Sequence, residues 1–200
     1  VPTFHMSVCV DDGLMKVTHV IRGEDHLSNS PRHVLLFKAF GFEPPKFAHL
    51  SLIHGPGGEP LSTLYGAVSI PEFIEERGYF PEALRNYLAL LGWSPKDNRE
   101  IFTPEELIAA FQIENVMHHA AIFTEDKLMW INGEHLKKMA DDDYLSRAIT
   151  YIQKKNVSVK DETVMKQVLL GLKTDIHRFD ELPKAFEFLE ESVYRGKLEQ

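Results

Sequence analysis

Residues 17–53 read VTHVIRGEDHLSNSPRHVLLFKAFGFEPPKFAHLSLI, and this stretch decides the fold. Its two ends, Val17 to Arg22 and Phe47 to Ile53, are short apolar runs of the kind that forms strands. Between them, Ser30 followed by Pro31 is typical of a helix start, and Gly41 is typical of a helix end. A strand, a helix and a strand in this order predict a βαβ unit of a parallel sheet, in which ligands bind beyond the carboxyl ends of the strands.

The segments on either side of this unit differ in character. Upstream, Phe4 to Val10 is another β-rich run, and Asp11-Asp12-Gly13 after it predicts a turn. From residue 69 onward, apolar residues recur at helical spacing, which predicts a mainly helical body. Capping-box patterns begin at Ser69 and at Thr103. Beyond residue 140, three further amphipathic runs, the last from Phe179 to Val193, predict a small helical bundle.

The composition limits the classes of function. The 200 residues carry a formal net charge of -8, so the chain as a whole does not attract a polyanion, although a local basic patch stays possible. The one cysteine, Cys9, excludes a disulfide framework and a multi-cysteine zinc site, and the spacings of the ten histidines fit no metal-ligand pattern. The sequence contains neither a signal peptide nor an apolar run of membrane-spanning length. We therefore expect a cytoplasmic protein without a membrane partner or a bound metal.

Four blocks of the sequence together resemble one known family. They are Asp11-Asp12, Val20-Ile21-Arg22-Gly23-Glu24-Asp25-His26-Leu27-Ser28-Asn29-Ser30-Pro31-Arg32, Phe47-Ala48-His49-Leu50 and Pro81-Glu82-Ala83-Leu84-Arg85-Asn86-Tyr87-Leu88-Ala89-Leu90-Leu91-Gly92-Trp93. The blocks resemble the second half of the catalytic domain of bacterial glutamyl-tRNA synthetases, specifically over residues 2–139 and more loosely beyond. The resemblance implies an α/β remnant of a Rossmann-type class I synthetase catalytic domain at residues 1–68. It further implies a mainly α-helical stem-contact region at 69–139 and, at 140–200, a helical bundle that begins an anticodon-binding region.

Arg22 is the first candidate for a binding residue. A guanidinium at the carboxyl end of a strand can hold a carboxylate through two hydrogen bonds. From spacing alone, the more frequent arrangement is a structural ion pair with Glu24, Asp11 or Asp12.

The resemblance reverses this preference, because it implies that the substrate glutamate contacts Phe4, Val8 and Arg22. It also implies that ATP, which the family uses with magnesium, contacts Asp25, His26 and Ile53. Phe4 stands where the family usually has a tyrosine, so a hydroxyl that could bond the substrate is missing.

The loop at residues 60–64 departs from the family. The family pattern there is Lys-Leu-Ser-Lys-Arg, whose lysines neutralise the charge that grows on the triphosphate during adenylate formation. Here the loop consists of Pro60, Leu61, Ser62, Thr63 and Leu64, so every cation is gone. Since one such group contributes roughly 10²–10³ in rate, losing two predicts a decrease of roughly 10⁴–10⁶. We therefore expect no catalytic residue in this loop, and the family's His-Ile-Gly-His-type motif does not occur in the 200 residues.

The sequence leaves three hypotheses for function and does not decide whether the chain alone is an enzyme. The first is a truncated glutamyl-tRNA synthetase-like protein, inactive in aminoacylation on its own. It would bind tRNA of the Glu or Gln type, or glutamate and ATP, in an accessory or regulatory role. The second is part of an active glutamate-tRNA ligase that an upstream segment or a partner chain completes. The third is a protein-binding module, because an incomplete sheet leaves an apolar face and an unpaired edge for a protein partner or a homodimer.

Overall fold

The two apolar runs of residues 17–53 form neighbouring parallel strands. Strand β1 (His19–Gly23) pairs with β2 (Lys46–Leu50), and the register places Arg22 beside His49. A 3₁₀ turn (Glu24–Asn29) and helix α2 (Ser30–Ala39) connect the strands. Pro31 lies in the first turn of α2, and Gly41 follows the end of the helix with a φ of 73°, the left-handed conformation that favours glycine there. The predicted βαβ unit is confirmed.

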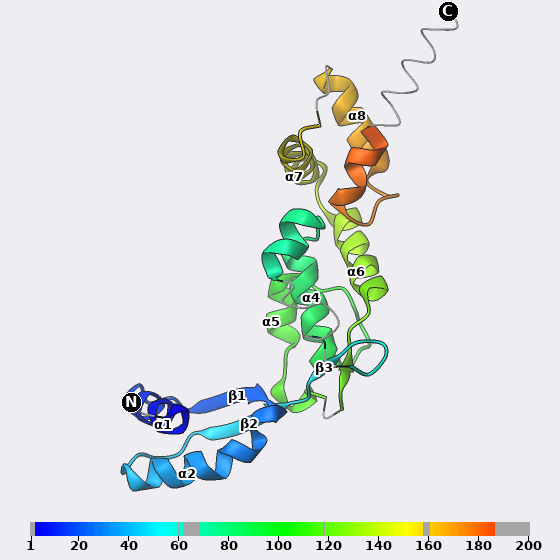
Figure 1. Cartoon of the computed structure of the whole chain (residues 1–200). Coiled ribbons are helices and arrows are strands. Elements are labelled where there is room, and N and C mark those ends of the chain that lie inside the picture. Colours follow the sequence, from blue (N-terminus) through cyan, green and yellow to red (C-terminus); the bar gives the residue numbers. More distant parts are fainter. Residues whose placement is uncertain (1–2, 60, 62–68, 118, 158–160, 187–200) are drawn as a thin grey trace, which may run out of the picture.

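The molecule as a whole is elongated and bent (Figure 1). The computed structural model describes residues 3–59, 61, 69–117, 119–157 and 161–186. The α/β unit lies at one end, the helical body extends away from it, and the bundle lies at the far end of that body (Figure 1).

The strand predicted at Phe4 to Val10 is wrong, because this segment belongs to helix α1 (Phe4–Leu14), which also contains the turn predicted at residues 11–13. Alternating apolar residues and valines favoured a strand. Packing against α2 favours a helix, since His5 and Cys9 then lie one turn apart on one face. His5 Nδ1 lies 2.9 Å from His33 Nε2, and the buried Cys9 thiol donates to the His33 carbonyl at 3.8 Å. In a strand these two residues would be about 13 Å apart and could not both reach His33.

Two further short strands connect the α/β unit to the helical body. β3 (Ile53–His54) pairs in parallel with β4 (Ala121–Ile122), so the strand predicted from Phe47 to Ile53 is divided between two sheets. The body itself consists of a π-helical turn (Glu72–Glu76), α4 (Pro81–Gly92), α5 (Pro104–Ala110), a 3₁₀ turn (Ile113–Asn115) and α6 (Glu125–Lys138).

The two helix starts predicted in the body, at Ser69 and Thr103, differ in which groups accept from their first backbone amides. At Thr103 the capping box is confirmed, because Thr103 Oγ1 accepts from the Glu106 amide and Glu106 Oε2 accepts from the Thr103 amide. At Ser69 the predicted capping box is wrong, because the Ser69 backbone carbonyl accepts from the amides of Glu72 and Phe73 and, among the described residues, the turn has no side-chain cap.

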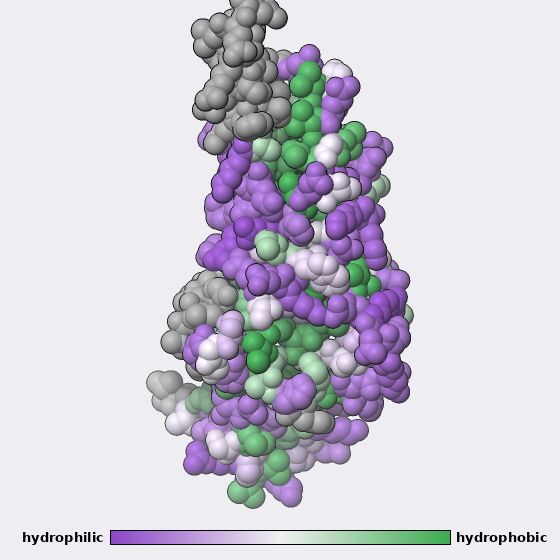
Figure 2. Space-filling model, turned by 90° about the vertical axis from the view of Figure 1, so that its right-hand side faces the viewer, coloured by the Kyte–Doolittle hydropathy of each residue, from purple (hydrophilic) through white to green (hydrophobic). Residues whose placement is uncertain are grey.

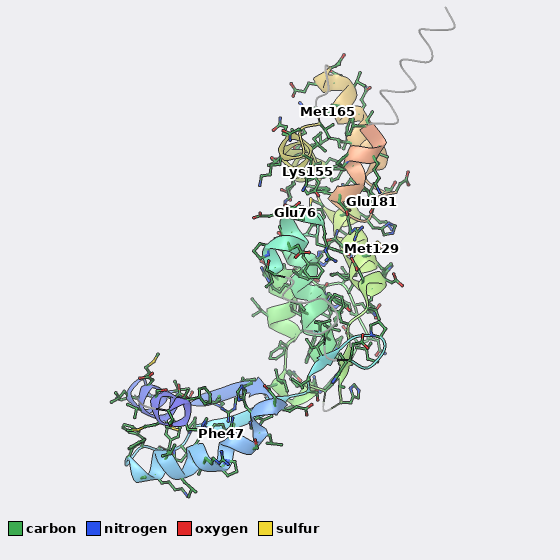
Figure 3. All side chains as sticks on the ribbon, in the orientation of Figure 1. Phe47, Glu76, Met129, Lys155, Met165 and Glu181 are labelled. Atoms are coloured by element: carbon green, nitrogen blue, oxygen red, sulfur yellow. The ribbon has the colours of Figure 1, made fainter. Side chains whose placement is uncertain are left out.

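The bundle shares its hydrophobic core with the body. Its elements are α7 (Asp141–Lys154), α8 (Glu162–Leu172) and a 3₁₀ turn (Phe179–Glu181). One cluster of buried apolar side chains extends along the chain from Phe73 to Phe186 and draws on both parts. At their junction, Lys155 Nζ lies 2.5 Å from Glu76 Oε2 (Figure 3), and the Tyr151 hydroxyl donates to the Glu76 carbonyl at 2.8 Å. The last predicted run is described as far as Phe186, and its Leu189 and Val193 lie outside the described residues.

The α/β unit has a much smaller core than the body. Among the described residues before Ile53, the buried apolar side chains are Cys9, Phe37 and Pro45. Many other apolar side chains of the unit are exposed, namely Phe4, Met6, Leu14, Met15, Ile21, Leu27, Leu35, Phe40, Leu50 and Leu52. Of these, Ile21 and Leu50 lie on β1 and β2, and the others lie on the helices, turns and connections of the unit. An exposed apolar face on the sheet therefore stays a prediction.

Figure 2 shows one long face of the molecule. Hydrophilic side chains cover most of it, and apolar side chains gather in a patch at about the level of β3 and in a stripe near the bundle (Figure 2). No helix in the described part of the chain is long and apolar enough to span a membrane.

Candidate functional site

Arg22 lies at the carboxyl end of β1 and is surrounded by neutral hydrogen-bond acceptors. Its Nη2 donates to Ser30 Oγ at 2.8 Å and to the His26 carbonyl at 3.3 Å. Its Nε donates to His49 Nε2 at 3.4 Å, and its Nη1 lies 3.4 Å from His33 Nδ1. The acceptors come from the 3₁₀ turn, α2 and β2, so the βαβ connection itself assembles them around the arginine.

Among the described residues, no carboxylate neutralises Arg22. In the described ranges, no Asp or Glu oxygen lies within the 4.0 Å ion-pair limit of its guanidinium nitrogens, so the alternative of a structural pair with Glu24, Asp11 or Asp12 does not hold. Glu24 Oε1 instead accepts from the Leu52 amide at 3.3 Å. The guanidinium carbon lies 5.4 Å from the centre of the Phe47 ring, which is labelled beside β2 in Figure 3. The positive charge of this half-buried side chain is therefore available to an anionic ligand.

Burial and neighbouring charge disfavour protonation of His33, the buried histidine beside Arg22. His33 is 1% exposed, and its pKa is lowered by burial, by the Arg22 cation and by His5, in that order of importance. Ser30 Oγ also contacts His49 Nε2 at 2.9 Å, so the serine hydroxyl links Arg22 to this second ring. A cation with neutral acceptors on several sides is suited to binding a carboxylate.

The other residues predicted to bind glutamate lie on α1. Phe4 is 53% exposed, and its ring centre lies 6.0 Å from the ring centres of His26 and His33, so it belongs to the Arg22 surroundings. Val8 lies one turn further along the same helix. Both residues lie on helix α1 and not on the predicted strand, and their contact with glutamate stays a prediction.

The residues predicted to bind ATP are divided between two places. Asp25 is exposed, and its Oδ2 lies 3.7 Å from His26 Nε2, close to the Arg22 group. Ile53 belongs to β3 and packs against the core of the helical body. In the cation-free loop, Leu61 is partly buried against that same core, and the remaining positions lie outside the described residues, namely Pro60, Ser62, Thr63 and Leu64.

Sequence reasoning missed the residues that surround Arg22, which are His5, Ser30, His33 and His49. One signal was available, because a parallel pairing of the two predicted strands brings His49 beside Arg22. The others depend on how α1 and α2 pack, and no local pattern marks them. The histidines attracted attention as metal ligands, yet among the described residues no group of three or more His, Cys, Asp or Glu could hold a metal ion.

Two surface hollows lie away from Arg22. One, of about 460 Å³, lies between the end of α4, residues 94–100 and the segment around β4. The other, of about 730 Å³, lies at the amino ends of β1 and β2, opposite to the end that carries Arg22. Arg22 lines neither of these two hollows.

Comparisons with known proteins agree with the class that this arrangement indicates, a class I synthetase catalytic domain. Residues 1–130 match the family described as tRNA synthetases class I (E and Q), catalytic domain. The chain therefore belongs to this family, and it has the class I catalytic-domain fold with a small parallel sheet and mostly helical content.

Within the family, the chain is similar to glutamate-tRNA ligases. It is 43% identical to Glutamate-tRNA ligase 1 of Fervidobacterium nodosum, over 97% of this chain and 40% of that protein. It is 48% identical to the Aquifex aeolicus enzyme over 84% of this chain and 36% of the relative. A glutamate tRNA ligase from Elizabethkingia meningosepticum, solved in complex with its amino acid, superposes with a TM-score of 0.81 at 35% identity, over 94% of this chain and 40% of that one. The chain thus spans about two fifths of the length of these relatives.

Proposed function

We propose that this chain binds the carboxylate of glutamate through Arg22 and does not form glutamyl-adenylate on its own. The observation that carries the proposal is the Arg22 guanidinium, which has four polar contacts and no acidic partner in the described structure. A buried or half-buried cation that served only the fold would be expected to have a carboxylate partner. Similarity to glutamate-tRNA ligases supports glutamate as the ligand.

The loop composition supports the absence of adenylate formation. Pro60, Thr63 and Leu64 supply no positive charge for the triphosphate of ATP, and Glu59 beside them adds a negative one. Asp25 and His26 next to the Arg22 group, and Ile53 in β3, are the residues that we propose for ATP and its magnesium. Binding without turnover would fit an accessory or regulatory role.

Two measurements on the whole chain test this proposal. Titration with L-glutamate, followed by NMR or calorimetry, should show binding that Arg22→Gln weakens on the order of tenfold or more, because a charge-assisted bidentate contact is lost. Arg32→Gln is the matched control, since Arg32 is an exposed arginine of α2. ATP–pyrophosphate exchange with glutamate should stay at background. Exchange well above background would refute the inactivity, and equal effects of the two variants would refute the role of Arg22.

The helical body is the part that we propose for tRNA of the Glu or Gln type. Its exposed cations include Arg85, Lys96, Lys137 and Lys138, which lie within a chain of net charge -8. Binding to total tRNA should therefore be weak, should decrease with salt, and should enrich these tRNAs if the body recognises them. Retention that is independent of salt, or that shows no enrichment, would contradict specific docking.

The exposed apolar side chains of the α/β unit favour a second candidate function. β1 and β2 form a two-stranded sheet in the described structure, and Ile21, Leu50 and Leu52 are exposed on or beside it. We propose as the alternative that further strands of a glutamate-tRNA ligase, from an upstream segment or a partner chain, pack here and complete an active site. Adding residues equivalent to the first half of a related catalytic domain in trans should then restore exchange, and Arg22→Gln should abolish it. A homodimer through the same edge would instead appear as a concentration-dependent mass.

A further inference from the structure

We propose that three positioning residues, His33, His49 and Ser30, surround Arg22 as a neutral cage. The hydrogen bonds of each residue run in one fixed direction. The cage therefore holds the guanidinium in one orientation and leaves its positive charge unpaired for a carboxylate ligand. This inference rests on the proposed binding of a carboxylate at Arg22 for its functional meaning. The arrangement of the cage itself rests on the geometry alone.

The direction of the bonds on the His33 side follows from the chemistry of arginine. A guanidinium can only donate, so His33 Nδ1, which lies 3.4 Å from Arg22 Nη1, must accept. A neutral His33 ring that accepts on Nδ1 carries its proton on Nε2. That nitrogen lies 2.9 Å from His5 Nδ1, which then accepts and leaves the His5 proton on Nε2. Arg22, His33 and His5 thus form a chain in which each group donates to the next.

The His49 side follows by the same reasoning. Ser30 Oγ accepts from Arg22 Nη2 at 2.8 Å, so its own hydroxyl proton is free to point to His49 Nε2 at 2.9 Å. His49 Nε2 also accepts from Arg22 Nε at 3.4 Å, so the His49 proton must lie on Nδ1. The two histidines are therefore predicted to be opposite tautomers, His33 with the proton on Nε2 and His49 with it on Nδ1.

The neutrality of the cage decides what Arg22 can do. A carboxylate in the place of either ring would satisfy the guanidinium and compete with a ligand for it. A protonated ring would be a second cation within hydrogen-bond distance and would offer no acceptor, so Arg22 would lose its orientation. Neutral nitrogen and hydroxyl acceptors fix the plane of the guanidinium without cancelling its charge.

The charged and titratable groups that face His33 all bear on its protonation. They are Arg22 on β1, His5 and Asp12 on α1, and His26 in the 3₁₀ turn. Burial and the cations and rings outweigh Asp12, so His33 loses its proton at a lower pH than an ordinary histidine. We therefore expect protonation of His33 to weaken glutamate binding only in solution more acidic than pH 6.5, where a free histidine is half protonated.

Histidine-ring NMR on the ¹⁵N-labelled whole chain tests the cage without any ligand. The long-range ¹H–¹⁵N pattern should show His33 as the pure Nε2–H tautomer and His49 as the pure Nδ1–H tautomer at pH 7.5. In Arg22→Met, both rings should become mixtures and the pKa of His33 should rise. Exposed His19 on the same strand is the internal control and should be unaffected by Arg22→Met. A charged His33, or mixed tautomers in the unmodified chain, would overturn the cage.

Glutamate titrations of cage variants test its role in binding. His33→Leu should weaken glutamate binding on the order of tenfold, and His33→Gln, whose amide oxygen can still accept, should recover most of it. In His33→Gln, glutamate binding should also decrease less in acidic solution, because protonation of His33 no longer contributes. His19→Gln should leave glutamate binding and its pH dependence unchanged. Correct tautomers without any glutamate binding would refute the proposed function and leave the cage intact. Binding that is equal in His33→Leu and His33→Gln would refute the positioning role.

Discussion

Asn132 provides a quantitative test of whether the helical body and the bundle fold as one unit. Its side chain is fully buried on α6, its Oδ1 accepts from the Phe80 amide at 2.8 Å, and its Nδ2 donates to the His177 carbonyl at 2.6 Å. Asn132→Ala leaves both backbone groups without this partner. At about 1–3 kcal/mol for each of the two unsatisfied groups, we expect a loss of about 2–6 kcal/mol in the free energy of unfolding.

Urea unfolding followed by tryptophan fluorescence and by circular dichroism is the assay. Because Phe80 is the N-cap of α4 and His177 lies beyond α8, the main transition, which the body and the bundle share, should move to a lower midpoint in both probes, with an unchanged slope. Asn115→Ala is the control, since the Asn115 side chain donates a long 3.4 Å hydrogen bond to exposed Gln112, and it should cost under about 1 kcal/mol. A loss no larger than that of the control, or a shift in one of two separate transitions, would refute the reasoning that one core joins both parts.

Three other predictions concern separate parts of the molecule. Gly78→Ala should destabilise the protein by more than about 1 kcal/mol in urea unfolding, because Gly78 has a φ of 70° and a Cβ there would lie 2.8 Å from two backbone nitrogens. Gly41→Ala, with a φ of 73° and open space around the Cβ, should cost less, and equal losses would contradict the steric argument. Cys9, whose thiol pKa burial raises, should resist thiol reagents in the native protein, yet react at urea concentrations below the main transition, because the α/β unit has so small a core. Burial raises the pKa of Glu82 and hydrogen bonds from Arg147 lower it, with a net decrease. That carboxylate therefore stabilises the fold above its ordinary pKa of 4.5 and loses its effect as the pH falls, so Glu82→Gln should flatten the acid side of a stability–pH curve.

The elements that the sequence predicts well are those whose signals are local. Pro31 and Gly41 mark the two ends of α2, and the Thr103 capping box marks the start of α5, because each signal comes from backbone geometry within one turn. The strand prediction at α1 is wrong because the contacts that decide its structure are not local. Phe4, Met6, Val8 and Val10 alternate as a strand would, and only the contacts of His5 and Cys9 with α2 select the helix.

The candidate site, too, could be predicted from the sequence only where its signal is local. Arg22 could be chosen because it ends an apolar run in a βαβ unit, and strand ends of this kind carry ligand sites. What could not be predicted is the absence of an acidic partner, since Glu24 is close in sequence but is bonded to the Leu52 amide. His33 and His49 reach Arg22 from α2 and β2, so their role depends on packing that no spacing encodes.

The large hydrophobic core and the proposed binding residue Arg22 lie in different parts of this chain. The large core from Phe73 to Phe186 lies in the helical body, and Arg22 lies in a unit whose apolar side chains are mostly exposed. Pairing Arg22 with a nearby carboxylate would strengthen that unit, but it would also cancel the charge that a glutamate ligand needs. Neutral acceptors orient the guanidinium without cancelling its charge. They do not cover the exposed apolar side chains of the unit, so these still lower its stability. A ligand, or further strands packed on the sheet, should therefore stabilise the α/β unit far more than the body, since binding to a folded state adds its free energy where folding is weakest.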